Sequence, residues 1–136
     1  MSEKREVLKI LESDASKKIR AIKDKWEPNT KRAESLIKSR KDGITKLVNA
    51  VIEKALKQYG AKVNERMRVS FDDDWGGISI RSDKDEALVE LSKNLEAIVA
   101  KRDAEIAEVE QKASSIRRRI TLHGVDAEVL EMLESL

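Results

Sequence analysis

The sequence has 136 residues, of which 40% are charged and only 3% aromatic, and its formal net charge is +2. Because aromatic side chains supply much of the buried area in ordinary cores, this composition excludes a thick globular core and favours long helices with narrow apolar stripes. With no cysteine, disulfide bonds and thiol chemistry are excluded. The chain lacks a membrane-length apolar run and a signal-peptide core, which predicts one cytoplasmic domain, residues 1–136, without a membrane partner.

The charges are distributed unevenly along the chain. Residues 1–60 contain 16 Lys and Arg against 9 Asp and Glu, whereas residues 61–136 contain 12 against 17. Basic helices that pack beside acidic helices would explain this asymmetry. A basic N-terminal half that contacts nucleic acid is the alternative.

The first predicted helix covers residues 2–26 and the second covers residues 30–59. On the first, apolar residues recur at steps of three and four: Leu8, Leu11, Ala15, Ile19, Ile22 and Trp26. Pro28 lacks a backbone N–H and disfavours helical geometry at Glu27, which predicts a break or a sharp kink at 27–30.

The second predicted helix has an apolar stripe that is too broad for one neighbouring element. The stripe consists of Ile44, Leu47, Val48, Val51, Ile52, Ala55, Leu56 and Tyr59. It predicts contact with two elements and a place at the centre of the core. Gly43 suggests close packing or a bend, and Gly60 predicts a left-handed end to the helix.

Two runs of alternating apolar residues predict a β-hairpin over residues 62–81. Val69 and Phe71 alternate with polar residues, and so do Ile78 and Ile80. The sequence Asp-Asp-Asp-Trp-Gly-Gly between them is rich in turn-forming residues. A lone hairpin is marginally stable in water, so it must lie on helices or pair with another chain.

A long helix is predicted over residues 83–123, with Ser82 as its N-cap. Its apolar residues follow coiled-coil spacing, so the helix can pair with a second copy of itself or within the chain. Gly124 and Val125 fit a helix end, and Asp126 predicts the cap of a short helix over 127–135. The predicted fold class is mainly α, with long helices in an antiparallel coiled-coil-like or bundle arrangement, one inserted hairpin and a short C-terminal helix.

The tip of the predicted hairpin is a candidate binding site for a protein partner. Trp75 lies between Asp74 and Gly76, with Asp73 adjacent, and tryptophan is enriched in binding hot spots. Packing of Trp75 on the hairpin or on the long helix is the alternative. Contiguous carboxylates point in different directions, so this aspartate run is interpreted as a solvated turn rather than as a metal site.

Further candidates lie on the long helix and on the C-terminal helix. Arg117 and Arg118 either contact a partner or compensate the helix dipole. Self-association is assigned to the apolar residues of these two helices, Ile106, Val109, Ile116, Ile120, Leu130 and Leu133. No metal-ligand set, cofactor motif or nucleophile–base pair is found, so we expect no catalytic residue, no metal, no cofactor and no enzyme activity.

The overall pattern, from MSEKREVLKILESDASKKI through FDDDWGGISI to IRRRITLHGVDAEVLEMLESL, resembles small helical accessory proteins encoded by phages and prophages. The resemblance implies an oligomeric structural factor or a stoichiometric inhibitor. The leading hypothesis is therefore a non-enzymatic oligomer, most simply a dimer, that binds another protein. A protein that binds nucleic acid through its basic N-terminal half is the alternative hypothesis.

Overall fold

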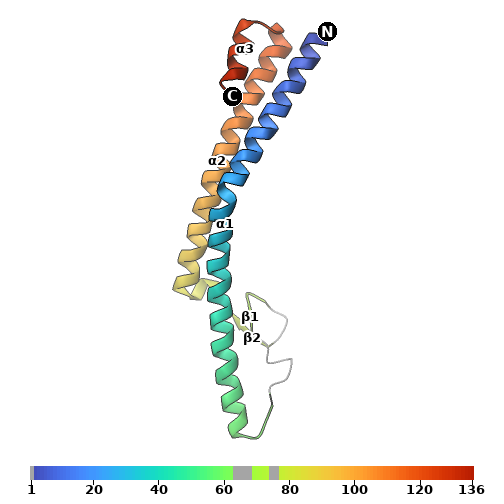
Figure 1. Ribbon diagram of the computed structural model, residues 1–136. Coiled ribbons are helices and arrows are strands. Elements are labelled where there is room, and N and C mark those ends of the chain that lie inside the picture. Colours follow the sequence, from blue (N-terminus) through green and yellow to red (C-terminus); the bar gives the residue numbers. More distant parts are fainter. Residues whose placement is uncertain (1, 63–68, 74–76) are drawn as a thin grey trace. The chain divides into compact units, whose positions relative to one another are not determined.

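The computed structural model describes residues 2–62, 69–73 and 77–136 and is mainly α-helical. The described elements, in chain order, are α1 (Ser2–Gln58), β1 (Val69–Phe71), β2 (Ile78–Ile80), a 3₁₀ turn (Ser82–Lys84), α2 (Glu86–His123) and α3 (Ala127–Glu134) (Figure 1). The chain divides into two compact units. Unit 1 comprises Met1–Pro28 and Ile98–Leu136, and unit 2 comprises Asn29–Ala97.

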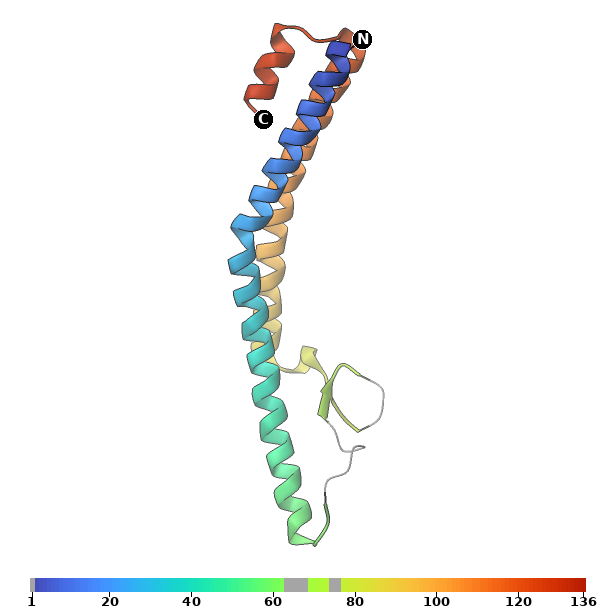
Figure 2. The same ribbon diagram turned by 45° about the vertical axis from the view of Figure 1, so that its right-hand side comes forward.

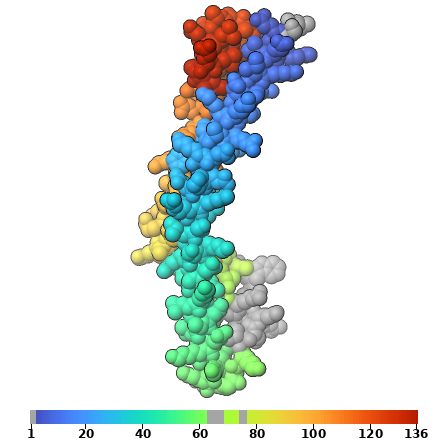
Figure 3. Space-filling view, viewed as in Figure 1, coloured from blue at the N-terminus to red at the C-terminus, as the bar shows by residue number. Residues whose placement is uncertain are grey.

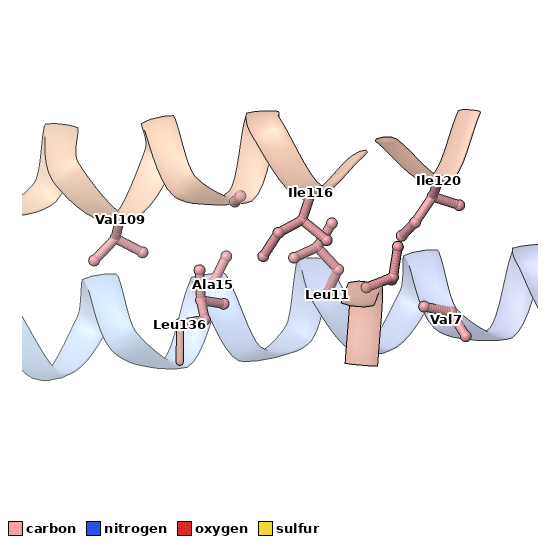
Figure 4. Close-up of a cluster of buried hydrophobic side chains, with 9 residues drawn as sticks. Val7, Leu11, Ala15, Val109, Ile116, Ile120 and Leu136 are labelled. Carbon is pink, nitrogen blue, oxygen red and sulfur yellow. The ribbon is translucent and has the colours of Figure 1, made fainter. Parts of the chain in front are cut away.

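Unit 1 is built on an antiparallel pair of helices, which confirms the predicted arrangement. Apolar side chains at steps of three or four face each other between α1 and α2, as Figure 4 shows for Leu11 and Ile116. The buried cluster consists of Val7, Leu11, Ala15, Val109, Ala113, Ile116, Ile120, Val129 and Leu136. The coiled-coil spacing of α2 is therefore satisfied within one chain, which answers the question that the sequence left open.

The short helix α3 turns back along the helix pair and completes this core (Figures 1 and 2). Gly124 adopts a φ of 76°, which ends α2 in the left-handed conformation. The Asp126 carboxylate then accepts a hydrogen bond of 2.9 Å from the Val129 N–H and caps α3. The predicted end of α2 and the predicted cap of α3 are both confirmed.

The predicted break at residues 27–30 is wrong, because α1 is one helix of 57 residues with Pro28 inside it. Proline removes one backbone hydrogen bond, but the turns on both sides of it are held by tertiary contacts. Trp26 is bonded to α2 on one side, and Ala33 is buried on the other. Packing on both sides therefore outweighs the local cost of the proline.

In unit 2, α1 packs against the first turns of α2. Ala33 of α1 and Leu88 of α2 are each buried there, at 2% and 1% exposed. Asp85 caps α2, since its carboxylate accepts a hydrogen bond of 3.1 Å from the Leu88 N–H. The predicted cap at Ser82 is therefore wrong: Ser82 begins the 3₁₀ turn, and the α-helix starts after Asp85.

The two strands occupy the predicted positions, but they pair in parallel with Val69 opposite Ile78. The inserted element is therefore not the antiparallel hairpin that the sequence predicts. Alternation of apolar and polar residues is the same in both kinds of pair, so it carries no information about direction. Six residues, 72–77, separate the strands in the sequence, and 74–76 among them lie outside the described residues.

Candidate functional site

The predicted tip of the hairpin is only partly covered by the structure. Trp75 and Asp74 lie outside the described residues, so their predicted binding role stays a prediction. Asp73 is half-buried and directly follows the turn at Asp72.

Asp72 has a structural role in the aspartate run. It adopts a φ of 54°, which is uncommon for a residue with a side chain, and its N–H donates to the Ile80 carbonyl at 2.9 Å. Its carboxylate accepts hydrogen bonds from the backbone N–H and the hydroxyl of Ser82, and these bonds lower the pKa of Asp72. Asp72, the first aspartate of the run, therefore links the end of β1 to the 3₁₀ turn before α2 by hydrogen bonds.

The three consecutive arginines of α2 point in different directions, as the helical geometry requires. Arg119 reaches α3, where it pairs with Asp126 and Glu128. Arg117 and Arg118 are exposed. The structure thus assigns the third arginine to the fold and leaves the two predicted partner-binding arginines on the surface.

A shallow groove of about 370 Å³ runs between α1 and α2 in unit 1. Its floor contains the small residues Ala15 and Ala113, and Glu12, Glu110 and Arg117 line it. Residues two apart on a helix lie about 200° apart, so Arg117 and Arg119 are on opposite sides of α2. The groove therefore lies on the side of the helix pair that α3 does not cover.

The residues assigned to self-association are mostly used within the chain. The side chains of Val109, Ile116 and Ile120 are buried in unit 1, and Leu133 is partly buried against them. Ile106 is half-buried, whereas Leu130 on α3 is 51% exposed. The intrachain core thus supplies the contacts that the sequence assigned to a second copy, and Leu130 alone of this set remains exposed.

Trp26 anchors the middle of α1 to α2 in unit 1. Its indole N–H donates a hydrogen bond of 2.7 Å to the Glu105 carboxylate, which also pairs with the Lys25 ammonium at 3.0 Å. The indole hydrogen bond is the main reason that the pKa of Glu105 is lowered, followed by the bond from Lys25. Trp26, the last residue of the apolar stripe in the first predicted helix, is therefore a half-buried polar anchor rather than a buried apolar contact.

In unit 2, Asp85 combines two functions. Besides capping α2, it accepts hydrogen bonds of 2.8 and 3.0 Å from the guanidinium of Arg40 on α1. The bond to Arg40 is the main reason that the pKa of Asp85 is lowered. Because the folded-state pKa lies below that of the unfolded chain, this interaction stabilises the fold above the ordinary pKa of about 4 and is lost as the pH falls.

Replacing Asp85 with asparagine is expected to lower the melting temperature at neutral pH, because the ionic bond to Arg40 is lost. The difference from the wild-type chain should shrink as the pH falls below about 4, since protonation then weakens the wild-type contact as well. Thermal unfolding followed by circular dichroism over a series of pH values measures this. Asp83→Asn is the control, because Asp83 is exposed and pairs only at 3.6 Å with Arg81. An equal loss at all pH values would contradict the prediction.

The Arg40–Asp85 contact marks the point on α1 at which α2 begins. From there α1 continues to Gln58, over about 18 residues or ~27 Å. In the described part of the chain no second helix accompanies this segment, and Figures 1 and 2 show it extending past the start of α2. Lys41 contacts Phe71 of β1, its ammonium 5.6 Å from the ring centre. Phe71 therefore lies on a different side of α1 from Leu47, which is about 120° around the helix from Lys41.

The uncovered side of this segment is apolar and basic. Leu36, Leu47 and Val51 are 48%, 66% and 60% exposed. Together with their helical neighbours they form the basic apolar face: Leu36, Gly43, Lys46, Leu47, Ala50, Val51, Lys54 and Lys57. The members from Gly43 onward recur at i, i+3, i+4, i+7, i+8, i+11 and i+14, so they share one side of α1. The face contains no Asp or Glu, and Figure 3 shows this part of α1, coloured green, at the surface.

Gly43 lies on the basic apolar face, where none of the described side chains packs closely against it. A Cβ atom added there would meet no other atom within 4 Å. Glycine nevertheless costs about 1 kcal/mol in a helix relative to alanine. It leaves the backbone accessible between Leu36 and Leu47, where another helix could approach closely.

This site is not predicted from the sequence, because the stripe from Ile44 to Tyr59 has the pattern of a core and predicts the centre of the core instead. Part of that stripe is indeed half-buried, including Val48, Ile52 and Leu56, but Leu47 and Val51 are exposed. The signal that could have found the face is the set of lysines one residue before and seven and ten residues after Leu47, on its side of α1, with no acidic residue among them.

Comparisons with protein-family models, with curated proteins and with solved structures find no match to this chain. Among the residues that the structure describes, no helix is both long enough and apolar enough to cross a membrane. The basic apolar face is therefore the leading candidate for the functional site.

Proposed function

We propose that this chain is a protein-binding module whose working surface is the basic apolar face of α1. The observation that carries the proposal is the exposure of Leu47 and Val51, at 66% and 60%. Both residues lie on the segment of α1 that extends past the start of α2. Scattered exposed leucines are normal on protein surfaces. Here, however, the exposed apolar residues share one side of a helix with an accessible glycine, which favours a docking surface.

The chemistry of the face favours a protein partner. Its apolar side chains gain free energy only when other apolar groups exclude water from them, at about 25 cal/mol per Å² of buried apolar surface. The lysines around them can pair with carboxylates at the rim of such a contact, where charges contribute to orientation and to the rate of association. This arrangement fits the helix-in-groove or helix-on-helix mode of recognition.

The proposal predicts that Leu47→Ser abolishes partner binding without loss of helix. The purified 136-residue chain, immobilised and incubated with extract of the cells that encode it, should retain a saturable partner in stoichiometric amount. Serine at this exposed position removes the apolar contact but leaves the intrachain core untouched. The retained partner is identified by mass spectrometry, and the helix content is checked by circular dichroism.

Leu122→Ser is the matched control, because Leu122 is also a helical leucine with 66% exposure but lies on α2 in unit 1. The control variant should retain the partner like the wild-type chain. Equal retention by wild type and by Leu47→Ser would contradict the proposal. Loss on Leu122→Ser with retention on Leu47→Ser would move the working surface to unit 1.

Nucleic acid is the second candidate, favoured by the absence of acidic residues from the same face. Lys46, Lys54 and Lys57 could contact phosphates, and binding would then weaken steeply with salt. Leu47 and Val51 would contribute no binding free energy to such a contact, because the phosphate backbone offers no apolar surface. A mobility-shift titration of DNA and RNA at low salt separates the candidates: retardation that survives Leu47→Ser would favour nucleic acid over a protein.

A further inference from the structure

The helix α3 carries a surface that is complementary to the basic apolar face. Its outer side consists of Ala127, Leu130, Glu131 and Glu134, which recur at i, i+3, i+4 and i+7 and are all exposed. We call this set the acidic face of α3. Leu130 is 51% exposed and stands beside the two carboxylates. No basic residue occurs in α3.

The core contacts of α3 fix which side it presents outward. Val129 is fully buried in unit 1 and Leu136 is 6% exposed. The Asp126 cap and the pairing of Arg119 with Glu128 hold the start of the helix. The acidic face is therefore a preformed surface on a supported helix, and its binding would not require the chain to refold.

Like faces cannot pair with each other in this chain. Two basic apolar faces would bring Lys46 and Lys54 against the same lysines of a second copy, and two acidic faces would oppose carboxylates. Like-charge juxtaposition disfavours both arrangements. A basic apolar face against an acidic face, by contrast, pairs leucine with leucine at its centre and lysine with glutamate around it.

We propose that the basic apolar face of one copy binds the acidic face of α3 of a second copy. This inference rests on the proposed function, because it names the partner of the same surface. The contact joins two different surfaces, so two copies can make it twice or a series of copies can make it once each. Since α3 is only about 12 Å long, one contact is smaller than a standard protein interface, and association in the micromolar range or weaker is expected.

Charge reversal on each face tests the proposal. Sedimentation velocity of the wild-type chain at low salt should show association that rises with concentration and falls with added salt. Lys46→Glu/Lys54→Glu should weaken association about tenfold, and so should Glu131→Lys/Glu134→Lys, because each change replaces attractive pairs with repulsive ones.

The decisive measurement mixes the two charge-reversed variants. In the mixture, the unchanged basic apolar face of one variant meets the unchanged acidic face of the other, and the two reversed faces also match. Association should therefore return to about the wild-type level. Lys9→Glu/Lys17→Glu is the control for net charge, since both lysines are exposed on α1 in unit 1. It should associate like the wild-type chain.

The outcomes separate this inference from the proposed function. A wild-type chain that remains monomeric at all concentrations, or a mixture that fails to associate, would overturn the pairing of the two faces. If Leu47→Ser still abolishes capture of a different protein in that case, the proposed function stands and its partner is another chain. Association that is restored in the mixture supports the inference whether or not the extract supplies a further partner.

Discussion

Replacing Leu11 with alanine is expected to lower the free energy of unfolding by about 2–5 kcal/mol, the usual cost of truncating a fully buried leucine. Leu11 is 0% exposed and lies in the cluster where α1, α2 and α3 meet. Figure 4 shows it directed toward Ile116 of α2. Truncation leaves a cavity that side chains fixed on three helices cannot readily fill, which places the expected cost well above that of a surface change.

Urea unfolding followed by circular dichroism measures this cost, and Ile10→Ala is the matched control. Ile10 is the preceding residue on the same helix turn but is 52% exposed, so its truncation should cost about 1 kcal/mol or less. If the two variants lost equal stability, the three-helix core would not depend on Leu11 as described. If Ile10→Ala cost more, the side of α1 that faces the core would have to be reassigned.

Replacing Pro28 with alanine is expected to raise the free energy of unfolding by roughly 1–3 kcal/mol. Pro28 is exposed and lies inside α1, where its missing N–H leaves one backbone carbonyl without its helical donor. Alanine restores the donor and removes the clash of the ring with the preceding turn. Urea unfolding measures the gain, and circular dichroism should show helix content that is equal or higher.

Asn29→Ala is the control for this change, because it introduces the same residue at the next exposed position of the helix. Its gain should stay below about 1 kcal/mol, which is the difference in helix propensity alone. A Pro28→Ala variant that is less stable than wild type would contradict a continuous α1 that merely tolerates the proline. The interruption at Pro28 would then be a required feature of the fold.

Local signals predicted much of the fold. The caps and helix ends at Gly60, Gly124 and Asp126 depend on backbone rules that act over a few residues, and the structure confirms them. The apolar seam of α2 was also predicted, since its spacing is a property of one helix. Continuity through Pro28 could not be predicted, because it depends on Trp26 and Ala33 finding partners far away in the sequence.

The direction of the strands could not be predicted either, because it depends on contacts between residues outside each strand. The same holds for the location of the candidate site. Alternation in Val69–Phe71 and Ile78–Ile80 predicts two strands but not a parallel pair. Leu47 and Val51 have the residue type and spacing of a core, and they are exposed because α2 begins beside Arg40 rather than farther along α1. No pattern within α1 records where another helix starts.

The segment of α1 beyond Arg40 should exchange its amide hydrogens faster than the segment before it. Its turns are supported by the strands on one side only, so opening them requires less free energy than opening the three-helix core around Leu11. A partner that binds only the intact helix increases the free energy needed to open it. This increase grows with the logarithm of the partner's concentration. Slower amide hydrogen exchange at the residues around Leu47 would then measure directly how much of the basic apolar face is occupied.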